Sequence, residues 1–230
     1  MNNIAIFYHV YQAGDWINVF QEQIIRMIDS GLFDAADIIH IGINGNQELP
    51  VYGLPEKVNI VRNQQPKLEE ASTIKCLFDF CCDNENYNVA YTHTSGVSWS
   101  INTQNPKHIE IYKNKSLWRK YSDYFVLDNW QRCIELLKTH DCVGTEWLDD
   151  AYLGDIHYPE LQHYAGNIWW SKSEYIKTLD PKFILNNEKY GRFASEFFIG
   201  SGNPNHFNFY SSRRHLYYNP IYEDEYKLCK

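Results

Sequence analysis

The segment His163-Tyr164-Ala165-Gly166-Asn167-Ile168-Trp169-Trp170 sets two adjacent indoles beside a glycine and hydrogen-bonding side chains. Aromatic faces stack on the apolar C–H face of a pyranose, while asparagine and histidine side chains hydrogen-bond its hydroxyls. Gly166 has no Cβ, so the backbone there can come close to a ligand. These residue types predict a sugar-binding segment over Gly166 to Trp170, with Gly166 and Asn167 nearest the transferred sugar. Of Trp169 and Trp170, one is expected to face the ligand while its neighbour, on the opposite side of a strand, packs inward. The alternative is a core strand that buries the indoles.

A second segment, Arg192-Phe193-Ala194-Ser195-Glu196-Phe197-Phe198, places a carboxylate among aromatic residues. A charge in an apolar environment is costly unless it is paired or functional. Glu196 is therefore a candidate functional group, and a carboxylate can serve as a general base. An ion pair with Arg192, four residues away on one helical face, is the alternative role. The pair Asp149-Asp150 and the side chain of His163 are alternative bases, although a surface loop also explains the two aspartates.

The elements that must position these residues follow from the hydrophobic periodicity. Apolar, β-branched segments predict strands over residues 4–10, 37–43, 58–61 and 89–93, and helical spacing predicts helices between Asp15 and Gly31 and over residues 69–82. Strands that alternate with helices lie parallel in one sheet. The fourth strand ends at Thr94-Ser95-Gly96, where open α/β sheets hold ligands.

The rest of the chain is less regular. A polar stretch over residues 99–115 precedes a long helix that we expect to begin near Ser116, with a break near Asp128. A strand is predicted over residues 142–147, and shorter helices over 173–179 and 190–199. No internal repeat, low-complexity tract or Pro/Gly linker divides the 230 residues, so the sequence predicts a single domain.

The composition narrows the class of protein. A net charge of −8 argues against a nucleic-acid partner, because that interaction needs clustered cations. No apolar run is long enough for a membrane span and no signal peptide is recognisable, so we expect a cytoplasmic protein, of a cell or of a virus-infected host, compatible with peripheral contact with a membrane. The six cysteines show no zinc spacing and are expected to be free thiols.

Several nucleotide-binding motifs are missing. No Gly-x-Gly-x-x-Gly or Walker-type loop follows the first strand, and no Gly-x-Ser-x-Gly elbow occurs. The remaining ligand-binding hypothesis is that the carboxyl ends of the strands hold a nucleotide without a glycine-rich motif.

Four sequence features together resemble the GT-A glycosyltransferase fold, and in particular small glycosyltransferase-like proteins of polysaccharide gene clusters and large DNA viruses. They are Tyr91-Thr92-His93-Thr94-Ser95-Gly96-Val97-Ser98 at the end of the fourth strand, Trp118-Arg119 at the opening of the long helix, the glycine-indole segment, and Arg192-x-x-x-Glu196. The resemblance implies a single Rossmann-like α/β domain over residues 1–230, with a mixed, mostly parallel central sheet flanked by helices. It further implies a nucleotide-binding half over residues 1–98 and a half for the donor sugar and acceptor over residues 99–230.

The resemblance also implies roles for individual residues. The first strand and its loop would hold the nucleotide, with stacking by Tyr8 or Tyr11, while His93 and Arg119 would hold the donor; a core position is the alternative for Tyr8. The residues expected to bind substrate in these two regions are Tyr8, His9, Val10, Tyr11, Gln12, His93, Thr94, Ser95 and Arg119.

The chain departs from the family at the metal site. GT-A enzymes carry Asp-x-Asp at the end of the fourth strand, where carboxylates hold Mn²⁺ or Mg²⁺. Here Tyr91-Thr92-His93-Thr94 has no carboxylate. Either His93 contributes to a divalent-cation site, or basic groups such as Lys115, Arg119, Arg213 and Arg214 neutralise the leaving diphosphate directly.

The predicted function is sugar transfer from a UDP- or GDP-sugar to a glycan acceptor, by inversion, with Glu196 as the base. One alternative is a carbohydrate-binding or nucleotide-sugar-binding module that shares the fold without catalysis, which the missing Asp-x-Asp suggests. A second is a nucleotidyltransferase, which normally needs a glycine-rich basic loop after its first strand.

Overall fold

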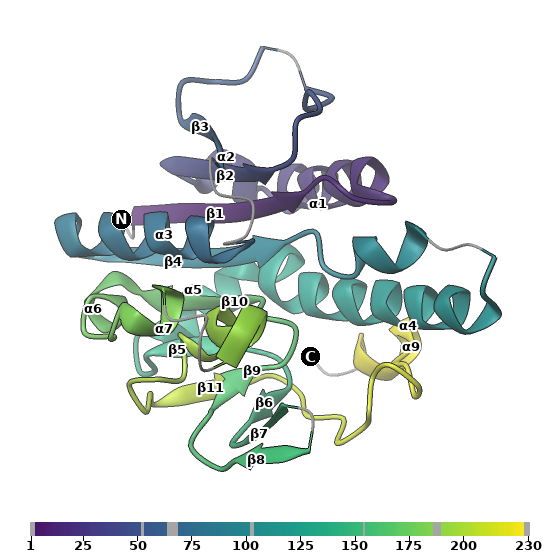
Figure 1. Cartoon of the computed structure of the whole chain (residues 1–230). Coiled ribbons are helices and arrows are strands. Elements are labelled where there is room, and N and C mark those ends of the chain that lie inside the picture. Colours follow the sequence, from purple (N-terminus) through teal and green to yellow (C-terminus); the bar gives the residue numbers. More distant parts are fainter. Residues whose placement is uncertain are drawn as a thin grey trace.

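Seven strands form one sheet within the described part of the computed structural model, residues 3–51, 53–63, 69–101, 104–153, 155–185 and 190–227. Their order is β11-β5-β10-β4-β1-β2-β3 (Figure 1). The strands are β1 (Asn3–Tyr11), β2 (Ile38–Asn44), β3 (Val58–Arg62), β4 (Tyr87–His93), β5 (Cys142–Gly144), β10 (Trp169–Lys172) and β11 (His206–Asn208). Only β10 is antiparallel to its neighbours. The predicted mixed, mostly parallel sheet is confirmed.

Helices cover both faces of this sheet (Figure 1). The α-helices are α1 (Trp16–Asp29), α2 (Leu32–Ala35), α3 (Ala71–Asp83), α4 (Pro106–Asp123), α5 (Trp130–Leu137), α6 (Ser173–Ile176), α7 (Lys182–Leu185) and α9 (Glu223–Tyr226). The described residues also form two 3₁₀ helices, η2 (Val97–Ile101) and η4 (Gly191–Phe197), and a π-helical turn, η3 (Tyr124–Asp128). Two small antiparallel pairs lie beside the sheet: β6 (Trp147–Leu148) with β9 (His163–Tyr164), and β7 (Ala151–Leu153) with β8 (Ile156–Tyr158).

The central strand β1 shows how the sequence builds the layers. Its side chains alternate between two apolar clusters, because successive residues of a strand point to opposite faces. Ile4, Ile6 and Val10 pack with residues of α1 and α5, whereas Ala5 and Phe7 pack with residues of α3 and α6. Both faces of the strand are therefore buried, as parallel sheets require.

The long helix begins earlier than the sequence predicted. It starts at Pro106 instead of near Ser116, because Asn105 caps it by accepting a hydrogen bond from the Lys107 backbone N–H, and proline is favoured in the first turn. The predicted break near Asp128 is confirmed by the π-helical turn that separates α4 from α5. None of the described helices is long and apolar enough to cross a membrane, and the five described cysteines are free thiols.

Candidate functional site

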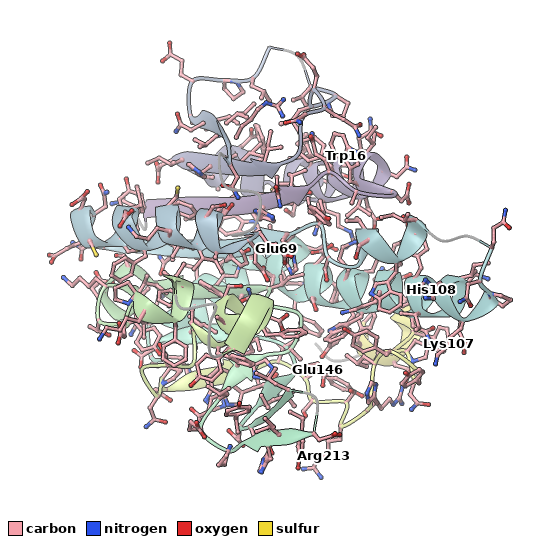
Figure 2. The ribbon with its side chains drawn as sticks, in the orientation of Figure 1. Trp16, Glu69, Lys107, His108, Glu146 and Arg213 are labelled. Carbon is pink, nitrogen blue, oxygen red and sulfur yellow. The ribbon has the colours of Figure 1, made fainter. Side chains whose placement is uncertain are left out.

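A cleft of about 440 Å³ opens at the carboxyl ends of β1 and β4. The first half of the chain contributes the ends of these strands, the loop into η2, and Glu69 and Glu70 just before α3; Glu69 is labelled in Figure 2. The second half contributes α4, the hairpin β7–β8, the segment before β10 and η4. The predicted site residues that line the cleft are His9, Tyr11, His93, Thr94, Ser95, Asp150, His163, Gly166 and Glu196.

The two indoles of the opening segment do not line the cleft. Trp169 and Trp170 are both 0% exposed, on opposite faces of β10. The Trp169 Nε1–H donates to Oδ1 of Asn167 at 2.7 Å, and the Trp170 Nε1–H donates to the Val126 carbonyl at 2.7 Å. The prediction that they stack on a sugar is wrong: β10 is an interior strand with helices on both sides, so neither ring is available to a ligand.

Other predicted binding residues are also interior or bonded elsewhere. Tyr8 and Val10 are buried, and the Tyr8 hydroxyl donates to Gln23 at 2.8 Å. Gln12 lies outside the cleft lining and bonds the backbone of Gln47 through both atoms of its amide. Asn167 is 1% exposed, at a φ of +51°, and its amide bridges Glu70 and Trp169. We therefore correct the prediction that these side chains contact the substrate.

Arg119 has a structural role instead of a donor-binding one. Its buried guanidinium donates to the Ser95 carbonyl at 3.1 Å and approaches Glu22 at 3.5 Å. It thus fixes the loop after β4 without lining the cleft itself. Arg214 pairs with Glu225, and Arg213 lies on the C-terminal segment, well apart from Glu69 in Figure 2.

Lys115 is the cation that the cleft presents. Among the described cleft-lining residues, no other lysine or arginine occurs. Its Nζ lies 4.3 Å from the ring centroids of both Trp118 and Tyr217, a cation–π arrangement that holds the ammonium group in place. Lys115 is one of several basic residues that the sequence offers for the diphosphate. The fold places Lys115 in the cleft lining and Arg119 outside it.

One aromatic wall of the cleft comes from residues that the sequence did not single out together. Trp99 and Trp118 each meet Tyr217 edge to face, at centroid distances of 6.4 and 5.9 Å. All three line the cleft. They belong to η2, α4 and the C-terminal segment, so no sequence spacing could have grouped them.

Glu70 is a cleft residue that sequence reasoning missed, because a glutamate at a helix N-terminus is explained by the helix dipole. Its Oε2 accepts hydrogen bonds from the Tyr91 hydroxyl at 2.8 Å and from the Asn167 amide at 3.2 Å, and lies 3.8 Å from Nδ1 of His93. The other ring nitrogen of His93 lies 2.8 Å from the Gly166 carbonyl. This carboxylate therefore ties α3, β4 and the glycine segment together.

Two cleft histidines are held neutral by burial. Burial lowers the pKa of His9 to about 4, although nearby Glu70 opposes the shift, and Nδ1 of His9 lies 2.8 Å from the Thr73 hydroxyl. Burial also lowers the pKa of His163. Its Nδ1 lies 3.0 Å from the Leu161 carbonyl, which requires a proton on Nδ1 and leaves Nε2 as an acceptor.

The acidic candidates differ in their surroundings. Glu196 lines the cleft from η4 and is partly buried. The alternative of an ion pair with Arg192 stays a prediction, because the side chain of Arg192 lies outside the described set. Asp150 is bonded to His157, with Oδ2 2.8 Å from Nε2.

The described residues do not fit the divalent-cation site of the GT-A pattern. They bring together no group of three or more His, Cys, Asp or Glu side chains with metal-binding geometry. We therefore assign no step of the reaction to a metal.

No protein-family model and no curated protein sequence matches this chain. A solved structure of 2-C-methyl-D-erythritol 4-phosphate cytidylyltransferase from Thermus thermophilus is similar with a TM-score of 0.39 and 8% sequence identity, over 99% of this chain and 96% of that one.

Proposed function

We propose that the chain transfers a sugar from a nucleoside-diphosphate sugar, a UDP- or GDP-sugar, to a glycan acceptor in this cleft. The observation that carries the proposal is the convergence of a carboxylate, Glu196, and an immobilised cation, Lys115, on one cavity at the carboxyl ends of β1 and β4. Sugar transfer needs both groups, because a hydroxyl loses a proton as a diphosphate gains charge.

The carboxylate would act on the acceptor. Glu196 takes the proton of the attacking hydroxyl, whose oxygen forms the new bond to the anomeric carbon. The bond from that carbon to the diphosphate breaks at the same time, and the nucleoside diphosphate leaves. A single displacement of this kind inverts the configuration of the anomeric carbon.

The cation would act on the leaving group. Lys115 can neutralise the diphosphate as its bond to the sugar breaks, and its position over two rings limits the reorganisation that this requires. Tyr11 is the exposed aromatic residue at the end of β1 and is the candidate for stacking on the base. His93 and Ser95 line the same cleft as Tyr11 and Lys115 and are further candidates for contact with the donor.

The test is nucleoside diphosphate release from a panel of UDP- and GDP-sugars, with oligosaccharide acceptors and with or without Mn²⁺. Glu196→Gln should lower turnover by about 10²-fold or more, because the amide cannot accept the proton, and should leave donor affinity measured by calorimetry nearly unchanged. Glu135→Gln, on the surface of α5 and paired with Lys138, is the matched control.

Wild-type turnover in Glu196→Gln would overturn the assignment of the base. Pyrophosphate release from a nucleoside triphosphate, without nucleoside diphosphate release from any sugar donor, would replace sugar transfer by nucleotidyl transfer, the activity in the name of the cytidylyltransferase above. Donor or glycan binding without any turnover would indicate a binding module.

A further inference from the structure

The hairpin β7–β8 forms one rim of the cleft. Residues of this hairpin and of the β6 end that line the cavity are Leu148, Asp150, Ala151, Tyr152 and Leu153. Tyr152 lines the cleft and is 67% exposed, the largest exposed fraction among the exposed aromatic residues of the described chain. Leaving an aromatic ring in water forgoes the stabilisation that its burial would give, so the position needs an explanation.

The ring of Tyr152 is exposed but held in place. In the antiparallel register Tyr152 pairs with His157, so the two side chains project from the same face of the hairpin. Their rings stack at a centroid distance of 4.6 Å and an interplanar angle of 19°. His157 is fixed in turn by Asp150, at 2.8 Å between Nε2 and Oδ2.

This arrangement has the properties of a sugar-stacking platform. A flat ring that is already immobilised loses little entropy when a ligand stacks on its second face. The C–H face of a pyranose matches an aromatic face, and the adjacent carboxylate of Asp150 can accept hydrogen bonds from hydroxyl groups. Among the described residues, no ring other than His157 stacks on Tyr152.

The platform is coupled to the predicted base by direct packing. Ala151, Leu161 and Phe197 form a small buried cluster, against which Leu153 and Phe193 also pack. Phe193 and Phe197 belong to η4, the element that carries Glu196. A sugar on Tyr152 would thus lie on a hairpin that packs directly against the element carrying the proposed base.

We propose that Tyr152, stacked on His157, forms a subsite for a sugar unit of the glycan acceptor. That the bound glycan is the acceptor rests on the proposed function. The binding of a glycan to this ring can be measured without any donor.

The experiment measures binding of chito-, manno- and gluco-oligosaccharides to the full chain by saturation-transfer NMR and calorimetry, without nucleotide. Tyr152→Ala should weaken glycan binding by about tenfold, which is the scale of one aromatic contact, whereas Tyr152→Phe should retain it. His157→Ala should weaken binding less than Tyr152→Ala, because the ring remains but loses its support. Ile156→Ala, an exposed position on the same hairpin that does not line the cleft, is the control for damage to the hairpin.

The two proposals fail separately. Equal glycan affinity in wild type and Tyr152→Ala, or no binding of any of these glycans to the wild type, would overturn the subsite even if sugar transfer is observed. Glycan binding that depends on Tyr152, without nucleoside diphosphate release from any donor, would overturn the transfer reaction and support the subsite. A loss of binding in Ile156→Ala equal to that in Tyr152→Ala would also overturn the role of the ring.

Discussion

At the scale of single residues, the carboxylate of Glu70 is the acceptor for two buried donors. The Tyr91 hydroxyl is fully buried, and both burial and Glu70 raise the pKa of Tyr91 well above its usual value, so the phenol stays protonated and keeps donating. The Asn167 amide is equally enclosed. Removing the carboxylate takes away the acceptor that both donors share.

We therefore expect Glu70→Ala to lower the free energy of unfolding by about 1–3 kcal/mol, the cost of leaving buried donors unsatisfied. Glu70→Gln keeps an acceptor oxygen and should cost less. Glu69→Ala, at the neighbouring position, serves as the comparison, and urea denaturation measures all three. An equal loss of stability in the Glu69 and Glu70 alanine variants would contradict the role given to this carboxylate.

Part of this chemistry can be predicted from residue types. Glu196, His93, Gly166 and Lys115 carry groups that suit sugar transfer, and the structure brings them to one cleft. The aromatic surface could not be predicted. Adjacent indoles in a strand point to opposite faces, and their exposure depends on whether helices cover both faces, which is a property of the tertiary fold.

At the scale of elements, the turn before β10 sets the shape of the cleft. Gly166 has a φ of +88°, and a Cβ there would lie 3.3 to 3.4 Å from the indole of Trp118. Backbone conformation and steric contact both favour glycine at this position. The steric contact is with Trp118, which forms part of the cleft wall. Gly31 separates the effect of backbone conformation from that of steric contact, because its φ is +76° but a Cβ added there would meet nothing within 4 Å.

Gly31→Ala should lower the free energy of unfolding by about 1 kcal/mol or more, through backbone strain alone. Gly166→Ala should cost more, and it should also weaken donor or glycan binding because Trp118 must move. Urea denaturation and calorimetry provide the two measurements. If Gly166→Ala leaves ligand affinity at the level of Gly31→Ala, the contact with Trp118 does not shape the site.

The elements themselves were predicted unevenly, for physical reasons. The first four strands and the helices between them have long apolar runs or clear helical spacing, and the structure places them within a few residues of the prediction. In the second half many strands have two to four residues, too short for a period to emerge. The antiparallel direction of β10 likewise depends on long-range pairing with β4 and β5, which no local pattern records.

At the scale of the whole molecule, a buried polar network joins the helices of one face to the end of β4. Asp123 at the end of α4 accepts hydrogen bonds from Gln23 of α1 at 3.0 and 3.1 Å. The same amide reaches the His93 carbonyl at 3.3 Å. Burial raises the pKa of Asp123 from 3.8 to about 7, although Arg119 acts in the opposite direction.

This shift links global stability to pH with a definite sign. The folded protein binds the Asp123 proton more tightly than the unfolded chain, so this contribution to stability is complete below about pH 4 and is lost as pH rises to about 7. The slope is at most about 1.4 kcal/mol per pH unit. Asp123→Asn does not titrate, so the difference in unfolding free energy between about pH 5 and about pH 8 should be smaller in the variant, measured by urea denaturation. An identical pH dependence in both proteins would contradict the shift.

The distribution of the seven tryptophans has a consequence for observing the molecule at work. Trp99 and Trp118 line the cleft, and Trp118 lies under the ammonium group of Lys115, whereas Trp16, Trp147, Trp169 and Trp170 are enclosed in the interior. The seventh, Trp130, is half-buried at the start of α5, where its indole N–H donates to the Ser30 carbonyl. Indole emission depends on nearby charges and water. The interior rings thus supply a steady background, and the two at the cleft give the protein an intrinsic optical reporter of occupancy that needs no attached dye.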